Sequence, residues 1–577
     1  MSHNPFPTET PAVVTCGLPY ANGALHLGHL RTYVGGDVLT RALRTLGQQT
    51  AFVSGSDMHG TPIAVNAREA GISPETFALQ WHERYRATFP RFDIEFDQYG
   101  HTHDETNTTL TQEIVHTLDE RGYIYDAEIE IAWDSELDQP LPDRYIEGTC
   151  PYCGATARGD ECENCGRHLE PGELEQPQSV LTDNPATYRT RRHKFFRLSD
   201  FEEYLHGFID RLEGTSNAKN QPREWIENEL RDWNITRDID WGIDYPGETE
   251  EDLVLYVWVD APIEYIASTK QYSERLDSDD FDWNVVWKGN PSDLGQPLSE
   301  PLIEGGEIVH IIGRDIIQHH TVFWPAILRA IGYNEPRAVM ASGFMTLDGK
   351  AFSTSRNYAI WADDYLDEGF DPDLLRYYLI TTGGFQQDID FSWDRFQERV
   401  NSELVSNVGN FVYRSLLFAH RNFNGTPSKA LSDDVYDRIE EAIITFRHSI
   451  NDYSLRNATN AGVNLGHFGN EYIQRHEPWA LIDSEPDQAA QVIRDCVQLV
   501  KAITVLLEPT LPGKMEQLWT QLGEGGFVHD ITVTTALEAP PTEFDGPTEL
   551  FKKISDERIT DLNEQLQSRN EENSDTN

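Results

Sequence analysis

The chain is short of basic residues and has no long apolar run. Its 577 residues include 46 lysines and arginines against 97 aspartates and glutamates, a formal net charge of −51. No run of about 18 apolar residues occurs, which argues against a transmembrane helix. The polar segment Met1 to Thr8 lacks the basic and then apolar pattern of a signal peptide. We therefore expect a cytoplasmic protein that does not bind a membrane.

The acidic excess is spread along the whole chain. Acidic clusters recur far apart, as at 250–252 and 277–280, and most of the basic residues are arginine. A surface that is acidic throughout is typical of halophilic proteins, because concentrated salt screens the self-repulsion. The alternative is an acidic protein that repels nucleic acids, whose phosphates attract lysine and arginine. Charge alone does not decide between these two interpretations.

Cysteine is also scarce, with six in the chain, and four of them cluster. Cys150 and Cys153 form one C-x-x-C pair and Cys162 and Cys165 form another, each followed by glycine. This spacing predicts one structural Zn²⁺ site with all four tetrahedral positions filled by thiolates. The alternatives are two disulfides or unligated thiols, and disulfides are uncommon in the cytoplasm.

The order of apolar segments predicts an α/β fold followed by a helical bundle. Residues 12–15 and 50–53 have the pattern of buried strands on either side of a helix from about His26 to Leu46, which is the β-α-β unit of a Rossmann-type parallel sheet. Strands are predicted again at 252–259 and 307–313. After Glu398 one apolar face recurs at helical spacing, formed by Val400, Leu404, Val405, Val408, Phe411 and Val412.

A pair of histidines stands at the start of the first predicted helix. His26 and His29 are three residues apart and share a helix face, and Gly28 between them leaves room for a nucleotide base. A helix N-terminus favours phosphate through its unpaired N–H groups. Two histidines on a helix face are usually packing or solvated residues. Their position behind a glycine-bearing turn, after the first strand of a β-α-β unit, favours a phosphate site.

The segment His26-Leu-Gly-His29 resembles the HIGH signature of class I aminoacyl-tRNA synthetases. Residues 15–23, 57–62, 256–263 and 313–325 resemble the methionyl-tRNA synthetases in particular, and the likeness runs from about residue 10 to 510. It implies a methionine–tRNA ligase, which activates L-methionine with ATP to methionyl-adenylate and pyrophosphate. The methionyl group then passes to tRNA(Met) for initiation and elongation of translation.

The resemblance also divides the chain into segments. They are the first half of the Rossmann-type catalytic domain (1–124), an inserted connective domain with the zinc knuckle (125–240), the second catalytic half (241–335), a stem-contact region with a KMSKS-like loop (336–397), a helical anticodon-binding domain (398–540) and a C-terminal tail (541–577). The tail is polar and acidic from Glu564 onward, so we expect its end to be disordered.

Roles for single residues follow from the resemblance. The expected catalytic residues are His26, His29, Lys350 and Arg356. ATP, carrying Mg²⁺, is expected at His26, Gly28, His29, Gly313, Asp315, Ser353, Thr354 and Ser355. Asp57 would hold the α-ammonium of methionine, while the backbone of Leu18 and the hydroxyl of Tyr265 would face the sulfur. The rest of the methionine pocket would be Tyr20, Trp258, Ala261, Pro262, His320 and Trp324.

The second class I signature, KMSKS, is altered here. Residues 351–356 occupy its place as Ala-Phe-Ser-Thr-Ser-Arg, so both consensus lysines are missing. Lys350 and Arg356 would then supply the positive charge that offsets the departing pyrophosphate, because Thr354 offers only a neutral hydrogen bond. The alternative is an inert turn in a paralogue that binds tRNA without activating amino acids.

Three residues of the helical region match the anticodon readers of the family. Asn410 and Arg414 share a helix face, and Trp479 offers a ring on which a splayed base stacks. Without the family they would be a polar helix face and a buried tryptophan. We expect a monomer, and leave open a separate chain that supplies a further tRNA-binding domain.

The insertion argues against other class I enzymes. Leucine, isoleucine and valine enzymes carry a large editing domain there, whereas this segment spans only about 115 residues. The cysteine enzyme uses zinc inside its active site, but four cysteines leave no open position for a substrate thiol. A nucleotidyltransferase without a tRNA partner is disfavoured by the helical region.

Overall fold

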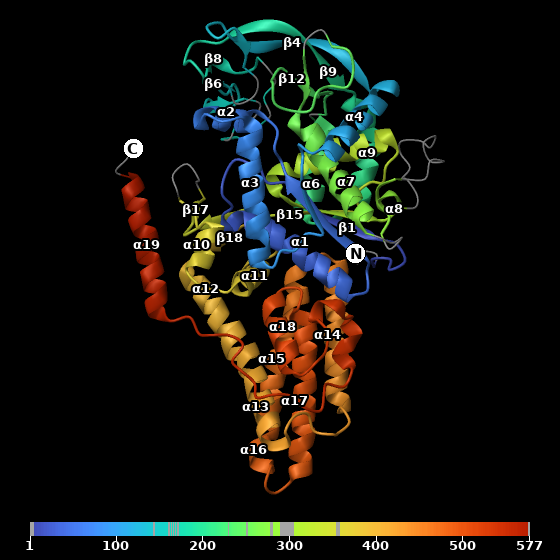
Figure 1. Ribbon diagram of the computed structural model, residues 1–577, viewed down its shortest axis with the longest axis vertical. Coiled ribbons are helices and arrows are strands. Elements are labelled where there is room, and N and C mark those ends of the chain that lie inside the picture. Colours follow the sequence, from blue (N-terminus) through green and yellow to red (C-terminus); the bar gives the residue numbers. More distant parts are fainter. Residues whose placement is uncertain are drawn as a thin grey trace.

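The computed structural model describes residues 5–141, 145–159, 162, 164–165, 167, 169, 172–228, 230–249, 252–276, 281–288, 305–352 and 358–574. Figure 1 shows an elongated molecule with a cap of antiparallel strands at one end, a parallel sheet in the middle and a helical bundle at the other end. None of the described helices is long and apolar enough to cross a membrane.

The central sheet has six parallel strands. Their order is β10 (Glu213–Gly214), β15 (Ala338–Ser342), β14 (Glu307–Gly313), β1 (Ala12–Cys16), β2 (Thr50–Ser56) and β3 (Gln98–His101). The predicted strands at 12–15, 50–53 and 307–313 are confirmed. The order reverses between β1 and β14, and sheets of this kind bind ligands at the carboxyl ends of the strands beside such a reversal.

Helices cover both faces of this sheet because its side chains alternate. Val14 and Cys16 of β1 belong to the core under α1 (Leu27–Thr45) and α11 (Pro372–Thr381). Val13 belongs to the core on the other face, under α4 (Glu105–Glu120), α7 (Val257–Arg275) and α9 (Trp324–Ile331). α2 (Thr61–Ala70) and α3 (Pro74–Thr88) follow β2, α8 (Trp283–Trp287) precedes β14, and a π-helical turn, η6 (His319–Phe323), precedes α9.

The strand predicted at 252–259 is wrong beyond its first residues. Only Val254–Leu255 is extended, as β13, which pairs with β12 (Thr236–Arg237), and α7 begins at Val257. The first turns of α7 are buried, including Val259 and Ile263. A helix buried on all sides shows the same unbroken apolar run as a buried strand, so periodicity does not separate the two.

The cap is inserted in the chain after α4, between strands β3 and β10 of the central sheet. Its main sheet joins β11 (Trp233–Asn234), β9 (Thr187–Phe196), β4 (Ile124–Asp134) and β5 (Gln139–Pro140), and a smaller one joins β7 (Thr156–Arg158), β6 (Ile146–Thr149) and β8 (Glu175–Ser179). α5 (Glu202–Arg211) and α6 (Ser216–Asn228) return the chain to the central sheet. The predicted boundaries cut through that sheet, because β10 lies within 125–240 and β15 within 336–397.

A short sheet and a bundle complete the fold. β17 (Lys350–Ala351), β16 (Met345–Leu347) and β18 (Ile389–Phe391) form the short sheet, beside α10 (Ala362–Asp367). The bundle contains α12 (Trp393–Arg399), the π-helix η7 (Val400–Gly409), α13 (Asn410–Phe423), α14 (Asp433–Asn451), α15 (Leu455–His476), α16 (Pro478–Leu481), α17 (Pro486–Leu507) and α18 (Pro512–Gln521). The predicted apolar face from Val400 to Val412 is buried, except that Val405 is half-buried.

The polar segment 564–574, for which disorder was expected, is helical. α19 runs from Asp556 to Ser574, and Ile559, Leu562 and Leu566 on one of its faces are buried in the core shared with the bundle. Figure 1 shows α19 beside α12. The acidic composition predicted disorder because three apolar residues at helical spacing are a weak signal, but they are enough to bury one side of a helix.

Candidate active site and metal centre

The two signature histidines close the N-terminus of α1. The Gly28 N–H donates to His26 Nδ1 at 3.1 Å, and the His26 N–H donates to His29 Nδ1 at 3.2 Å. The rings stack with their centroids 3.7 Å apart. Because each Nδ1 accepts a hydrogen bond, each neutral ring carries its proton on Nε2. The cap therefore leaves two Nε2–H donors.

Both imidazoles are neutral at pH 7. Burial lowers the pKa of His26 to about 2, with a further contribution from His29, and the surrounding protein lowers the pKa of His29 to about 4. The His29 side chain is nevertheless exposed to solvent, so it lies in a concave part of the surface and remains accessible to a ligand. A Cβ on Gly28 would lie 2.9 Å from His26 Cε1, so glycine is what lets the His26 ring fold back onto the helix.

The segment that replaces the KMSKS signature, and the chain just after it, pack against the histidine signature. Phe352 stacks on His26 with the centroids 4.8 Å apart, and the Leu27 N–H donates to the Ile360 carbonyl at 3.0 Å. Lys350 is exposed, with its Nζ 5.7 Å from the ring centroid of Tyr358. The expected ATP contacts Ser353, Thr354 and Ser355 and the expected catalytic Arg356 lie outside the described residues.

The carboxyl ends of β1 and β2 meet at Tyr20 and Asp57. The Asp57 N–H donates to the Pro19 carbonyl at 3.0 Å, and the Ala21 N–H donates to the Asp57 carbonyl at 2.8 Å. The Asp57 side chain is buried, and burial together with the nearby Asp260 raises its pKa well above the ordinary value. A buried carboxyl of this kind is stabilised as a carboxylate when an ammonium group binds beside it.

Tyr265 and His320 form a fixed polar pair next to this site. The His320 Nδ1–H donates to the Ile316 carbonyl at 3.0 Å, so its Nε2 accepts from the Tyr265 hydroxyl at 2.9 Å. The hydroxyl also accepts from the backbone N–H of Leu18, and burial lowers the pKa of His320 to about 4. Tyr265 thus contacts both of the other predicted residues, Leu18 and His320.

The other predicted pocket residues lie on α7, α9 and the end of β14. Trp258 is half-buried at the start of α7, where Ala261 and Pro262 are buried, and Trp324 is buried at the start of α9. Gly313 ends β14, and Asp315 follows in an exposed 3₁₀ turn. These elements all reach the edge of the sheet beside the β1–β14 reversal.

Several residues that hold the pocket in place were not predicted. Trp324 Nε1–H donates to His310 Nε2 at 3.2 Å, which leaves the His310 Nδ1–H to donate to Thr15 Oγ1 at 2.6 Å. His319 stacks on Trp258 with the centroids 3.8 Å apart. The one available signal was a histidine inside the apolar strand 307–313, since a buried polar residue needs a partner.

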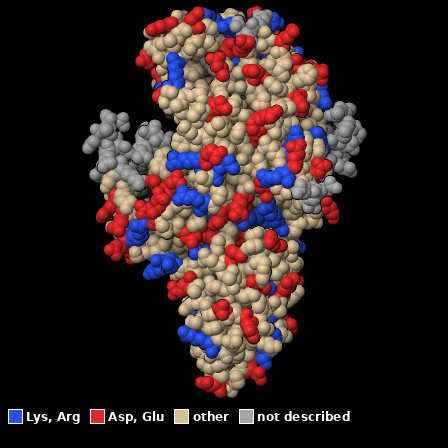
Figure 2. Space-filling view, viewed as in Figure 1, with Lys and Arg blue, Asp and Glu red and all other residues tan. Residues whose placement is uncertain are grey.

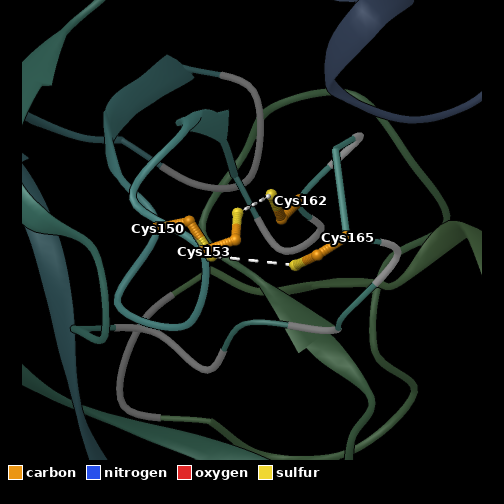
Figure 3. Close-up of side chains that lie close together, drawn as sticks. All are labelled: Cys150, Cys153, Cys162 and Cys165. Atoms are coloured by element: carbon orange, nitrogen blue, oxygen red, sulfur yellow. Dashed lines mark hydrogen bonds between the residues drawn. The ribbon is translucent and has the colours of Figure 1, made fainter.

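The four cysteines converge at the end of the cap (Figure 3). Cys150 Sγ lies 3.9 Å from Cys165 Sγ, and Cys153 Sγ lies 3.6 Å from Cys162 Sγ. Zinc–sulfur bonds of about 2.3 Å at tetrahedral angles require sulfurs about 3.8 Å apart. All four sulfurs lie within 4.8 Å of one another, and none is in a disulfide. The cluster can therefore hold a metal ion, and the donor set fits zinc.

The predicted anticodon residues lie at the far tip of the bundle. Figure 1 places α16 at the end remote from the sheet. Trp479 is 40% exposed, which rules out the alternative of a buried tryptophan. The Arg414 guanidinium lies 5.4 Å from the Trp479 ring centroid. Asn410 Nδ2 donates to Asn470 Oδ1 of α15 at 3.1 Å.

Known proteins resemble both halves of this architecture. The profile described as tRNA synthetases class I (M) matches residues 12–416, and that described as the anticodon binding domain of methionyl tRNA ligase matches residues 424–571. Methionine--tRNA ligases of Natronomonas pharaonis and Haloarcula marismortui are 66% and 64% identical, over 98% of this chain and 81% and 80% of theirs. These haloarchaeal relatives agree with the halophilic interpretation of the charge.

A solved structure has the same fold. The crystal structure of Mycobacterium tuberculosis methionyl-tRNA synthetase bound by methionyl-adenylate superposes with a TM-score of 0.75 at 23% identity, covering 94% of this chain and all of that one. With the profile covering most of the chain and relatives of this identity along nearly its whole length, the chain belongs to the methionine–tRNA ligase family of class I tRNA synthetases.

Proposed function

We propose that this chain activates L-methionine with ATP and then esterifies tRNA(Met). A methionine carboxylate oxygen attacks the α-phosphorus, pyrophosphate leaves, and the 3′-terminal hydroxyl of tRNA displaces AMP from the adenylate. The observation that carries the proposal is the arrangement around the β1–β14 reversal. There the loop after β1 leads to the neutral histidine cap of α1, and Tyr20 of that loop pairs with the buried Asp57 at the end of β2.

His26 and His29 act through their Nε2–H groups. Two neutral donors fixed at a helix N-terminus are aimed at negative charge that develops on phosphate oxygens, which is the most effective form of electrostatic catalysis. Gly28, Gly313 and Asp315 border the nucleotide, which brings Mg²⁺ with it. Lys350 and Arg356 supply the cationic contacts to pyrophosphate in place of the missing signature lysines.

The methionine pocket combines one charge with a set of rigid surfaces. Asp57 pairs with the α-ammonium, and the Leu18–Tyr265–His320 contact offers a polar edge to the thioether. The side chain would lie between Trp258 and Trp324, with Tyr20, Ala261 and Pro262 closing the slot. Sulfur packs favourably against aromatic edges, and the fixed His310–Trp324 contact keeps one of those walls in place.

The knuckle holds one structural Zn²⁺ through Cys150, Cys153, Cys162 and Cys165. Four thiolates leave no open coordination position, so the ion stabilises the cap and takes no part in the reaction. At the other end of the molecule, Asn410, Arg414 and Trp479 bind the anticodon, with an unpaired base stacked on the Trp479 ring.

Methionine-dependent ATP–pyrophosphate exchange in molar KCl tests the first step. We expect exchange with methionine and not with leucine, isoleucine, valine or cysteine. Absence of exchange with every amino acid would refute the proposed activity, and exchange with another amino acid would refute the specificity. Size-exclusion chromatography with light scattering tests the predicted monomer.

Replacement of Trp479 tests the tRNA end of the proposal. Trp479→Ala should raise the KM for tRNA(Met) roughly five- to 100-fold, the range for loss of one base–aromatic stack. Exchange should be unchanged, because α16 is remote from the sheet. Tyr436→Ala, at another exposed aromatic of the bundle, is the control. An unchanged KM in the Trp479 variant would remove this residue from the tRNA site.

A further inference from the structure

The loop between α11 and β18 contacts three elements that reach the carboxyl edge of the central sheet. It spans residues 382–388, and we name it the edge loop. Side chains of α1 and of the turn after β14 donate to it, and so does the backbone just after β15. None of its residues belongs to the proposed ATP, methionine, zinc or anticodon sites. Its position suggests a role in aligning the elements that carry those sites.

Arg31 fixes the edge loop to the helix that begins with the histidine cap. Its side chain is 1% exposed. Its Nη1 donates to the Gln387 carbonyl at 2.7 Å and to the Gly343 carbonyl at 3.0 Å, and its Nη2 donates to the Gly384 carbonyl at 2.9 Å. Burial lowers the pKa of Arg31 to about 10, and the nearby Asp388 counteracts this shift. A buried, charged guanidinium with three carbonyl acceptors leaves the loop little freedom to move relative to α1.

Two glycines allow the edge loop to approach its neighbours closely. A Cβ on Gly35 of α1 would lie 2.5 Å from the Phe385 ring, and a Cβ on Gly343 would lie 2.2 Å from the Gln387 carbonyl oxygen. The Gly343 N–H donates to the Phe385 carbonyl at 2.9 Å. Glycine is what permits one backbone to pack against another at this distance. The loop, α1 and the end of β15 are therefore held as one unit.

Asp388 ties the turn after β14 to the end of β15. The Arg314 Nη1 donates to both oxygens of the Asp388 carboxylate, at 2.9 and 3.1 Å, and the Phe344 N–H donates to Oδ1 at 2.8 Å. The Arg314 guanidinium also lies 3.8 Å from the Phe344 ring centroid. Arg314 stands between Gly313 and Asp315, the two residues proposed to border the nucleotide. A carboxylate and an aromatic ring thus hold this turn together.

From Asp388 the chain continues directly into the short sheet that carries Lys350. β18 pairs in parallel with β16, and β16 pairs with β17, which begins at Lys350. The Asp390 Oδ1 accepts the Gly349 N–H at 2.7 Å, in the turn between β16 and β17. A shift of Asp388 would therefore disturb the turn after β14 and the hairpin of Lys350 together.

We propose that Asp388 is a positioning residue for adenylate formation. It sets the distance between the turn that borders the nucleotide and the hairpin whose Lys350 contacts pyrophosphate, while Arg31 holds both against the histidine cap. Phosphoryl-transfer catalysis depends mainly on positioning, and a misplacement of about 1 Å can cost roughly 100-fold in rate. The inference rests on the proposed function, because it concerns the ATP of that reaction.

Asp388→Asn and Arg314→Gln test the proposal by ATP–pyrophosphate exchange in molar KCl. Each should raise the KM for ATP about tenfold and lower kcat about fivefold, because the two halves of the ATP site are no longer aligned. The KM for methionine should stay within about twofold, because Asp57 and Tyr265 lie on other elements. The double variant should lose no more than either single variant, since the two side chains form one contact. Losses that multiply in the double variant, or equal rises in both KM values, would overturn the proposal.

Stability and a matched variant separate positioning from a general defect. The Arg314 and Asp388 side chains are 40% and 53% exposed, so breaking their pair should leave the unfolding midpoint unchanged. Asp388→Asn removes one acidic group from a molecule whose acidic side chains extend from the cap to the bundle (Figure 2), so the overall charge hardly changes. Gln386→Ala is the control in the same loop, because Gln386 Oε1 accepts from the Ser216 N–H of α6 at 2.7 Å. An ATP defect of equal size in this control would overturn the specific role of Asp388.

Hydrogen exchange of backbone amides measures the same coupling without catalysis. Without ATP, Asp388→Asn should speed the hydrogen exchange of residues 314–317 and 344–350 relative to wild type and leave the bundle unchanged, because local contacts set local opening. Gln386→Ala should change neither segment. Unchanged hydrogen exchange in either segment of the Asp388 variant would overturn the proposal. If wild type shows no ATP–pyrophosphate exchange, the proposed function fails, and hydrogen exchange still decides whether Asp388 holds the two segments.

Discussion

At the scale of single residues, the neutral histidine cap depends on Gly28. A Cβ there would lie 2.9 Å from His26 Cε1 and 3.0 Å from Nδ1, so Gly28→Ala must displace the ring from the helix N-terminus. We expect kcat for ATP–pyrophosphate exchange to fall roughly 100-fold or more, as on loss of one fixed transition-state donor. The KM for methionine should change little, because Asp57 and Tyr265 are untouched.

Gly23 provides the matched control for this prediction. A Cβ on Gly23 meets no atom within 4 Å, so Gly23→Ala makes the same chemical change in the loop before α1 without a clash. Its exchange kinetics should equal those of wild type. Equal losses in the two variants would show that the loss does not come from displacement of the His26 ring.

Much of the candidate site could be predicted from residue patterns, but the hydrogen bonds that hold its side chains in place could not. The cysteine spacing places four thiols together, and the structure has them within 4.8 Å. The His26–His29 spacing does not reveal that each ring accepts a backbone N–H, which depends on the conformation of the cap. Nor does it reveal the His310–Trp324 contact, because residues on separate elements meet only in the folded chain.

At the scale of elements, the knuckle has too small a core to fold alone. Among its described residues, the hydrophobic cluster contains eight buried members, two of which are Cys150 and Cys162. Metal-binding free energy becomes folding free energy in units of this size. A chelator should therefore release one Zn²⁺ per chain and make residues 145–180 the first site of proteolysis. The central sheet and the bundle should keep their unfolding midpoint.

Cys16 and Cys496 give the control for the knuckle prediction. Both are buried away from the cluster, so Cys496→Ser keeps the metal, whereas Cys153→Ser should lose most of it. Elemental analysis of the purified variants measures this directly. Full metal content in the Cys153 variant would contradict the four-cysteine site.

A buried ion network joins the signature helix to the bundle. The fully buried Arg376 on α11 donates to Asp37 of α1 at 2.6 Å, and Arg41 donates to Asp37 at 2.8 Å and to Glu508, just after α17, at 2.9 Å. Removing one partner of a buried pair typically costs about 3–5 kcal/mol. Arg376→Met should therefore lower the free energy of unfolding in denaturant titrations by about that amount. Arg84→Met, which breaks an exposed pair with Asp363, should cost at most about 1 kcal/mol.

The same network sets a dependence on pH. Burial acts to raise the pKa of Asp37, but Arg41 and Arg376 outweigh it and hold the pKa below the ordinary value of 3.8. A carboxyl whose pKa is lowered by folding stabilises the protein above its unfolded pKa, and this stabilisation is lost as the pH falls through the folded value. Wild type and Arg376→Met should therefore differ most at neutral pH and converge below about pH 4. A constant difference down to pH 2 would argue against a charged Asp37.

Helices and strands were predicted well where the hydrophobic pattern kept one period over many residues. They were predicted poorly where a helix was buried on several sides or had a narrow apolar face. The strand at 307–313 and the helix after His26 were confirmed within a residue or two. The start of α7, at 257–259, was taken for the end of a strand because it is buried, and the end of α19, from Glu564 onward, for disorder because its apolar face is narrow. The strands β10 and β15 fell outside the predicted catalytic segments, because the pairing of distant strands is not encoded in local pattern.

At the scale of the whole molecule, the charge of −51 determines how salt affects tRNA binding. An ordinary RNA-binding protein loses affinity in salt, because each phosphate contact lowers log K by about 0.7–0.9 per tenfold rise in salt. Here salt also screens the repulsion between RNA and the acidic surface, since the Debye length falls from about 10 Å at 0.1 M to about 3 Å at 1 M. We expect the affinity for tRNA(Met) to rise with KCl at first, because screening outweighs the few arginine contacts. At higher salt, log K should then decline against log[KCl] with a slope of only about −2 to −3.

Binding titrations from 0.1 to 3 M KCl measure this salt dependence, with sucrose at matched osmolality as the control. A steep fall from the lowest salt onward would mean that basic contacts dominate, and that stacking on the Trp479 ring contributes little.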